Sequence, residues 1–288
     1  MRQRVITGIL FTVGVCAFFI PAYWLPVIAL VFSIIVSGFV IFELIKALRD
    51  GTFSPSLILV LIGAVLAFGL FIICYAFSLP LDTALAFYLL VVGSYCVACG
   101  IIVPIFRKHD DFALQNGLIS AGVVFYVTFP LYCFCCTMML IENGWFYGII
   151  GLFAPWISDV FAYFSGVTLG KHKIIEHISP KKTWEGCIGG ALGCAIAVML
   201  YSIIVIYRLD AMTINPVLFC VITFITGFVV SVMSQLGDWF ASVIKRRVGI
   251  KDYGKILPGH GGMLDRFDSA FFTLPIGLLL GLAAVNFF

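Results

Sequence analysis

Long apolar runs, separated by short polar segments, follow one another along the whole chain. Each run holds roughly 20 residues, which is the length that a helix needs to cross the hydrocarbon core of a bilayer. The pattern predicts nine membrane-spanning helices, at residues 5–22, 24–42, 57–79, 84–106, 117–141, 145–166, 186–207, 216–236 and 269–288. We therefore expect an all-α integral membrane protein, a polytopic bundle of about nine helices.

The composition agrees with this pattern. Of the 288 residues, 62% are hydrophobic and only 11% are charged, whereas roughly a quarter of the residues of a soluble domain are charged. The first 20 residues have the basic start and apolar run of a secretory signal, but no small-residue cleavage site is evident and a second run follows at once. We interpret this stretch as a retained first span.

The basic residues predict the orientation. With a cytoplasmic N-terminus, 16 of the 17 lysines and arginines fall on the cytoplasmic side and only Arg208 lies opposite, as the positive-inside rule requires. We expect a protein of the cell membrane or inner membrane with its active site at the cytoplasmic face. The excess of lysine and arginine on the cytoplasmic side either reflects the topology rule alone or also attracts anionic lipid head groups or nucleotides.

The charged residues divide the chain into two regions. Residues 1–140 form N-terminal transmembrane helices with brief polar turns, and residues 141–288 form a region with two cytoplasmic loops, 167–185 and 237–268. Ten of the 31 charged residues lie between 238 and 268. The ten cysteines fall almost entirely inside predicted spans, where we expect them to pack as small apolar side chains.

An aspartate marks the start of the first loop region. Asp159 lies within or at the edge of the sixth span, where a carboxylate is costly and usually marks a functional site. Tyr163 follows four residues later, so the two side chains share a helical face.

The segment "SPKKTWEG" forms a turn into the seventh span. Ser179 and Thr183 are candidates for ordinary helix caps, and the helix dipole favours Glu185 in the first turn. The alternative is a phosphate-binding role for Lys181 and Lys182.

The second loop region carries two groups of acids. Asp238, Ser242 and Lys245 are spaced so that a helix continuing from the eighth span presents them on one face. Asp265 and Asp268 form a carboxylate pair at the entrance to the ninth span. Before this pair, "PGHGG" cannot be regular helix and supplies backbone that can approach an anion closely.

Carboxylates beside lysines and arginines suit phosphoryl transfer. Carboxylate oxygens hold Mg²⁺, the metal bridges phosphate oxygens, and cationic side chains neutralise charge on the leaving group. The alternative is that these are ordinary surface charges of one loop. The placement of the acids at the membrane ends of two helices argues against that alternative.

The order and spacing of the second loop match a known signature. "SVIKRRVGIKD" followed by "HGGMLDRFD" resembles the signature of the phosphatidate cytidylyltransferases, or CDP-diacylglycerol synthases: S, two residues, KR, four residues, KD, then HGG, two residues, DR, one residue, D. "SDVFAYFSG", "GKHK" and "SPKKTWEG" are also similar to this family, which extends the resemblance over residues 150–288.

The resemblance implies an enzyme that joins CTP and phosphatidate to give CDP-diacylglycerol and pyrophosphate. It implies Mg²⁺ on Asp238 and Asp265 with Asp268 close by, a monovalent cation such as K⁺ in the same site, and a homodimer. The partners that it implies are CTP, phosphatidate and membrane lipids, with no nucleic acid.

The resemblance also assigns roles to single residues. Lys245, Arg246 and Lys182 neutralise phosphate charge, Asp159 contacts the metal or the ribose, and His260 either orients a phosphate, acts as an acid to pyrophosphate or packs the loop. The predicted catalytic residues are Asp238, Asp265, Asp268, Lys245, Arg246 and His260, with the three aspartates as metal ligands. The predicted substrate-binding residues are Ser242, Lys182, Lys181, Asp159, Lys251, Asp252, Gly261, Gly262 and Arg266.

Two alternative functions stay open. A related enzyme would use CTP with another lipid phosphate, such as an ether-linked isoprenoid phosphate or a polyprenol, because the head-group chemistry is shared. A transporter or channel would carry polar residues through several spans, whereas the first five predicted spans are almost devoid of charge.

Overall fold

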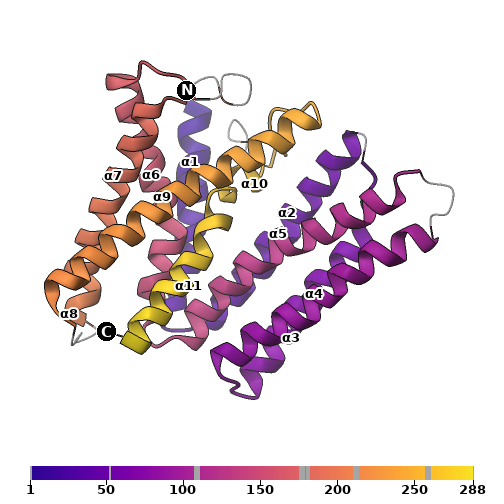
Figure 1. The fold of residues 1–288 in the computed structure, drawn as a ribbon, viewed down its shortest axis with the longest axis horizontal. Coiled ribbons are helices and arrows are strands. Elements are labelled where there is room, and N and C mark those ends of the chain that lie inside the picture. Colours follow the sequence, from indigo (N-terminus) through magenta and orange to yellow (C-terminus); the bar gives the residue numbers. More distant parts are fainter. Residues whose placement is uncertain are drawn as a thin grey trace. The chain divides into compact units, whose positions relative to one another are not determined.

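A computed structural model describes residues 2–51, 53–106, 111–174, 179, 182–209, 214–256 and 261–287. Lys181 and His260 lie outside these residues. The described part is helical, without β-strands, and its one isolated β-bridge joins Lys173 to Thr183. In chain order the helices (Figure 1) are α1 (Arg2–Phe19), the 3₁₀ turn η1 (Pro21–Tyr23), α2 (Val27–Asp50), α3 (Leu57–Ala76), α4 (Leu81–Phe106), α5 (Ala113–Leu140), α6 (Gly144–Leu169), α7 (Trp184–Tyr201), the π-helical turn η2 (Ser202–Ile206), α8 (Tyr207–Leu209), α9 (Pro216–Arg247), α10 (Leu264–Phe267) and α11 (Ala270–Phe287).

The helix lengths confirm an all-α polytopic membrane protein. Within the described residues, seven helices are long and apolar enough to cross a membrane, from α2 to α7 with η2, and α9. The first and last predicted spans correspond to shorter apolar helical stretches, Thr7–Tyr23 and Ala270–Asn286. The orientation stays a prediction.

Helix α2 extends well past the predicted end of the second span. The prediction stopped at residue 42 because charged residues begin at Glu43, but the helix continues to Asp50. Leu44, Ile45 and Leu48 keep a buried face in this extension, so an amphipathic last part follows the apolar part of the same helix.

The chain forms two compact units. The N-terminal unit contains Met1–Leu140 and Arg247–Arg266, and the C-terminal unit contains Ile141–Arg246 and Phe267–Phe288. The segment after α9 therefore belongs to the N-terminal unit although it is far from that unit in sequence. The functional division of the chain near residue 140 stays a prediction.

Helix α5 is the centre of the N-terminal unit. It packs against α2, α3 and α4, and Figure 1 shows α3, α4 and α5 side by side. Buried hydroxyls tie α4 to α5, because Tyr88 Oη lies 2.8 Å from Thr128 Oγ1 and Tyr132 Oη donates to the Ala84 carbonyl at 2.9 Å. These bonds satisfy polar groups that would otherwise be costly inside an apolar core.

Close backbone contact between α6 and α7 shapes the C-terminal unit. A Cβ on Gly190 would lie 2.9 Å from Ala162 Cβ, and one on Gly186 would lie 2.9 Å from the Ala162 carbonyl oxygen. Small residues allow helices in a membrane to approach in this way. Nearer the start of α6, the Thr273 hydroxyl of α11 donates to the Gly151 carbonyl at 2.7 Å. Helix α6 is thereby in contact with both α7 and α11.

Candidate functional site

A cavity of about 450 Å³ with charged side chains in its largely apolar wall lies in the C-terminal unit, lined by residues of α6, α7, α9 and the loop between α6 and α7. Asp159 and Tyr163 both line it, which confirms that the two residues share a face of α6. Lys173 and Lys182 contribute positive charge to its wall. Its volume is within the range of small-molecule sites, and its mixed charges suit a ligand with phosphates and hydroxyls.

Lys182 lines this cavity and also contacts Asp238 of α9. Its ammonium forms an ion pair with Asp238 Oδ2 and lies 5.6 Å from the centre of the Trp239 ring. Both side chains of the ion pair are partly exposed, at 25% for Lys182 and 29% for Asp238. The ion pair is therefore open to exchange with a cation or a phosphate from water.

Asp268 is a buried carboxylate beside other charges. Its Oδ1 accepts a hydrogen bond from the Ser269 amide at 2.7 Å. Burial, together with the negative charges of Asp238 and Asp159, raises the pKa of Asp268 to about 7, and the positive charge of Lys245 opposes this rise. Asp159, Asp238, Asp268 and Lys245 thus interact electrostatically within the C-terminal unit. A cation placed among these acids would relieve their mutual repulsion.

A buried hydrogen-bond network fixes the helices behind the cavity. The hydroxyls of Ser158 on α6 and Ser231 on α9 lie 2.5 Å apart. Gln235 Nε2 donates to Ser231 Oγ at 3.2 Å and to the Cys187 carbonyl of α7 at 3.1 Å. Because one network joins three helices, the residues that these helices contribute to the cavity keep fixed relative positions.

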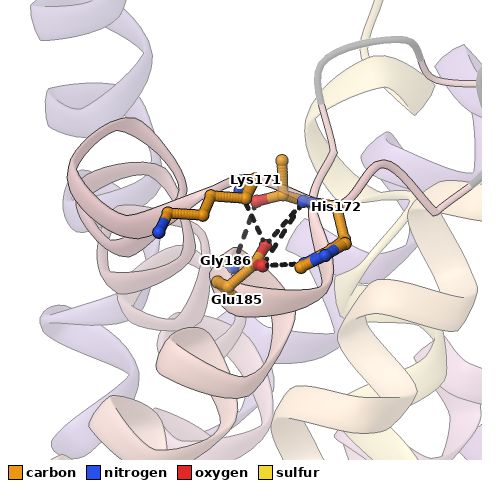
Figure 2. Close-up of polar contacts among 5 residues, drawn as sticks. Lys171, His172, Glu185 and Gly186 are labelled. Atoms are coloured by element: carbon orange, nitrogen blue, oxygen red, sulfur yellow. Dashed lines mark hydrogen bonds and ion pairs between the residues drawn. The ribbon is translucent and has the colours of Figure 1, made fainter.

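The loop between α6 and α7 is closed at its base by Glu185, as Figure 2 shows. The Glu185 carboxylate accepts hydrogen bonds from the backbone amides of Lys171 at 3.1 Å and His172 at 3.3 Å, and its Oε1 lies 2.6 Å from His172 Nδ1. Thr183 caps α7 by accepting from the Gly186 amide at 3.2 Å. The cap that the sequence predicts is therefore present, and Glu185 also holds the start of the loop that carries Lys173 and Lys182.

Helix α9 presents the predicted group of residues on one continuous helix. It runs to Arg247, so Asp238, Ser242 and Lys245 follow one another along it without a break. Ser242 and Lys245 are half-buried, and Arg246 is exposed.

In the N-terminal unit, Asp265 organises the second half of the signature. Its Oδ2 accepts hydrogen bonds from the Tyr253 amide at 2.8 Å and the Gly262 amide at 2.9 Å. Gly261 has φ +84°, and a Cβ there would lie 2.8 Å from Asp265 Oδ2. Glycine at this position is thus required by both backbone conformation and space.

The predicted site residues belong to both units. Asp159, Lys182, Asp238, Lys245 and Asp268 interact with one another or with the cavity in the C-terminal unit. The N-terminal unit contains Lys251, Asp252, Gly261, Gly262, Asp265 and Arg266. Lys251 and Asp252 are exposed, whereas Gly262 is buried and Arg266 is half-buried. The roles of all these residues stay predictions.

The sequence prediction missed Glu43 of α2. This residue is 3% exposed, and its carboxylate accepts hydrogen bonds from the amides of Met263 and Leu264, both at 2.9 Å. The available signal was an acid next to a long apolar run, since ionisable groups in such positions are usually functional.

The acids of the C-terminal unit fit a magnesium ion. Among the described residues, no three acidic, histidine or cysteine side chains converge as a protein-only metal site would require. Mg²⁺ is commonly held by one or two carboxylates together with phosphates and waters. Asp238 and Asp268, which interact electrostatically, supply a donor set of that kind.

Comparison with known proteins places these features in one family. The sequence model of the cytidylyltransferase family matches residues 2–282. The phosphatidate cytidylyltransferase of Thermotoga maritima is 35% identical over 183 residues, which are 63% of this chain and 65% of that protein. The protein of the same name from Staphylococcus haemolyticus is 42% identical over 169 residues, 59% of this chain and 60% of its own.

A third relative, the phosphatidate cytidylyltransferase of Aquifex aeolicus, is 31% identical over 220 residues, 72% of this chain and 78% of that protein. The matches to the Thermotoga and Staphylococcus proteins span less than two thirds of those proteins' lengths, at 65% and 60%. The family model nevertheless covers nearly the whole chain. This chain therefore belongs to the cytidylyltransferase family.

Proposed function

We propose that this protein transfers the cytidylyl group of CTP to phosphatidate and so produces CDP-diacylglycerol and pyrophosphate for phospholipid biosynthesis. Family membership and the names of the relatives support this proposal. The structural observation that carries it is the cavity of about 450 Å³, whose wall includes Lys182 in an ion pair with Asp238. Lys173 and Lys182 give this wall the positive charge that a phosphate-bearing ligand needs.

The proposed reaction exchanges one phosphorus–oxygen bond for another. An oxygen of the phosphatidate phosphate attacks the α-phosphorus of CTP, the bond from that phosphorus to the bridging oxygen breaks, and pyrophosphate leaves with the electron pair. A phosphate monoester loses its second proton near pH 6, so the attacking oxygen needs little help from a base. The protein mainly has to align the two substrates and neutralise their charges.

Positive side chains of the C-terminal unit carry out this neutralisation in the proposal. Lys182 is held at the cavity wall by Asp238, and Lys245 interacts with Asp268. Arg246 follows Lys245 on α9. Asp159, which lines the cavity, accepts hydrogen bonds from the ribose hydroxyls. Lys181 and His260 keep the roles expected from the sequence.

Asp238 and Asp268 would hold Mg²⁺ in the proposed site. The bound ion would neutralise charge on the phosphates, as it does in other phosphoryl transfers. Asp265, which belongs to the N-terminal unit, is the further ligand expected from the sequence. A monovalent cation such as K⁺ and a homodimer belong to the same proposal.

The site is proposed to face the cytoplasm of a cell membrane or inner membrane. The basic residues of both loops support this location, because 16 of 17 lysines and arginines fall on one side of the predicted topology. CTP would arrive from water there, and phosphatidate would arrive from the adjacent leaflet.

The proposal is tested with the purified protein in lipid vesicles and labelled CTP. Three vesicle preparations carry phosphatidate, a polyprenyl phosphate or an ether-linked isoprenoid phosphate as the only phosphomonoester lipid. We expect a labelled lipid product with phosphatidate, only in the presence of Mg²⁺. Faster product formation with either other lipid would instead assign a cytidylyltransferase for that lipid, and absence of labelled lipid in all three would overturn the proposal.

A further inference from the structure

Glu43 lies inside a candidate membrane span. It stands seven residues before the end of α2 at Asp50, which corresponds to about 10 Å along the helix. The side chain is only 3% exposed. A buried carboxylate is costly unless hydrogen bonds satisfy it, so its partners show what the residue does.

Both oxygens of Glu43 bind the start of α10. Oε1 accepts from the Met263 amide and Oε2 from the Leu264 amide, each at 2.9 Å and across 220 and 221 residues of sequence. The first amides of a helix have no partner within the helix, and an N-cap side chain normally satisfies them. Glu43 supplies this cap to α10 from another helix of the same unit.

Two glycines leave space for the Glu43 carboxylate. A Cβ on Gly262 would lie 2.5 Å from each Glu43 oxygen. A Cβ on Gly254 would lie even closer to Oε1, and its nearest contact outside Glu43 would be Gly262 Cα at 3.2 Å. Any larger residue at either position would have to displace the carboxylate. Gly254 and the segment 262–264 are therefore shaped around Glu43.

The same segment fixes Asp265. Asp265 Oδ2 accepts from the Gly262 amide at 2.9 Å, directly before the two amides that Glu43 binds. The charges of Glu43 and Asp265 are close enough to interact. Since three consecutive amides are shared between two carboxylates, a change at Glu43 would move the backbone that carries Asp265.

We propose that Glu43 is a positioning residue, whose carboxylate holds the first turn of α10 and thereby sets the place of Asp265 for cytidylyl transfer. This inference rests on the proposed function for its effect on activity. Its effect on the backbone of α10 is independent of that function. The two effects call for two separate measurements.

The first measurement is hydrogen–deuterium exchange of the full-length protein in detergent, followed for the segment 261–267. Glu43→Gln replaces one acceptor oxygen by an NH₂ group, which donates and cannot accept from a backbone N–H. We expect exchange of the Met263 and Leu264 amides to rise at least about tenfold. Asp50→Asn, at an exposed acid of the same helix, removes the same charge and should leave this exchange unchanged.

The second measurement is steady-state activity as a function of Mg²⁺ concentration. A misplacement by a fraction of an ångström at a reacting centre can lower the rate of the chemical step by about 10- to 100-fold. We expect Glu43→Gln to lower kcat by about that factor and to raise the Mg²⁺ concentration for half-maximal activity several-fold. A smaller amount of folded protein would lower kcat alone, because it leaves the Mg²⁺ requirement of the remaining enzyme unchanged.

A double-mutant cycle with Gly254→Ala tests the contact without altering the acid. In the wild-type background, Gly254→Ala should displace the carboxylate and reproduce the increased exchange. With Glu43→Ala, the added methyl group has no carboxylate to displace, so its further effect should stay below about twofold. If the Glu43 variants do not fold, Gly254→Ala alone still reports on the contact.

The inference is overturned if Glu43→Gln keeps wild-type exchange in segment 261–267, or wild-type kcat together with the wild-type Mg²⁺ requirement. A wild-type protein without activity toward CTP and phosphatidate would contradict the proposed function instead. In that case increased exchange in Glu43→Gln would still assign Glu43 the task of holding α10.

Discussion

Glu43 and Asp265 in the N-terminal unit each accept two backbone hydrogen bonds, whereas Asp268 in the C-terminal unit accepts one and, like Asp238, interacts with charged side chains. Backbone amides stay in place, so Glu43 and Asp265 fix the backbone at the residues whose amides they bind, which are Tyr253, Gly262, Met263 and Leu264. The Lys182 side chain can rearrange when a ligand enters. The N-terminal unit therefore holds its two carboxylates by fixed backbone groups, and the C-terminal unit holds Asp238 by a side chain that can move.

The environment of Asp268 makes this difference concrete. Its pKa is raised to about 7, first by burial and then by the charge of Asp238. When the pKa of a carboxyl group is raised in this way, a cation that approaches it stabilises the charged form. Glu43 and Asp265, which each accept two hydrogen bonds from backbone amides, gain less from such a cation, because more of their charge is compensated.

The strongest test of this difference is Asp238→Asn. The substitution removes one negative charge from the proposed Mg²⁺ site and leaves Lys182 without its partner. We expect kcat/KM to fall at least about 100-fold, the usual size of the loss of one group that stabilises transition-state charge. The rate at which label from radiolabelled CTP enters the lipid of phosphatidate vesicles measures this loss of kcat/KM. Glu142→Gln, at an exposed acid of the same unit, should keep wild-type activity.

Asp265→Asn is the corresponding substitution in the N-terminal unit. The sequence leads us to expect that it abolishes the conversion while membrane insertion stays intact. Because Asp265 also holds the Tyr253 and Gly262 amides, the variant should in addition increase hydrogen exchange in the segment 253–262, which Asp238→Asn should not do. Full activity of Asp265→Asn would contradict its assignment as a metal ligand.

A smaller effect is expected for Lys182→Gln. A hydrogen bond to a charged group contributes about 1.5–3 kcal/mol, so kcat/KM for CTP should fall roughly 10- to 100-fold. Lys171→Gln is the matched control, because Figure 2 shows the Lys171 side chain pointing away from Glu185 at the base of the same loop. Equal losses in the two variants would mean that total positive charge matters rather than the position of Lys182.

The smallest effect is expected for Glu185→Gln. The carboxylate holds the amides of Lys171 and His172 and so steadies the loop that carries Lys182. A looser loop should raise KM for CTP about two- to fivefold and leave kcat within about twofold. A loss of kcat above about tenfold would contradict this assignment and place Glu185 in direct contact with the substrates.

Local patterns made much of the C-terminal unit predictable. Asp159 and Tyr163 share a face because they are four residues apart, and both line the cavity. Thr183 caps α7 as its sequence context indicates. The group from Asp238 to Lys245 lies on one helix because no glycine or proline interrupts α9 after Gly237. Each of these features depends on neighbours within one or two helical turns.

Contacts between distant segments were not predictable. Glu43 meets Met263 across 220 residues, and the sequence offered only an acid at the end of an apolar run. Lys182, in the loop before α7, meets Asp238 of α9. The division of the signature between two units at Arg266 and Phe267 was equally invisible. Hydrophobic periodicity specifies which face of a helix is buried but not which distant residue it meets.

Transfer of the cytidylyl group from CTP to phosphatidate can be followed by the fate of two labels in one assay. CTP labelled at the α-phosphorus and CTP labelled at the γ-phosphorus are offered in parallel to the purified protein in phosphatidate vesicles with Mg²⁺. We expect the α-label in the lipid and the γ-label in pyrophosphate, in equal amounts. Transfer of the γ-label to the lipid, or no label in the lipid from either CTP, would contradict the account.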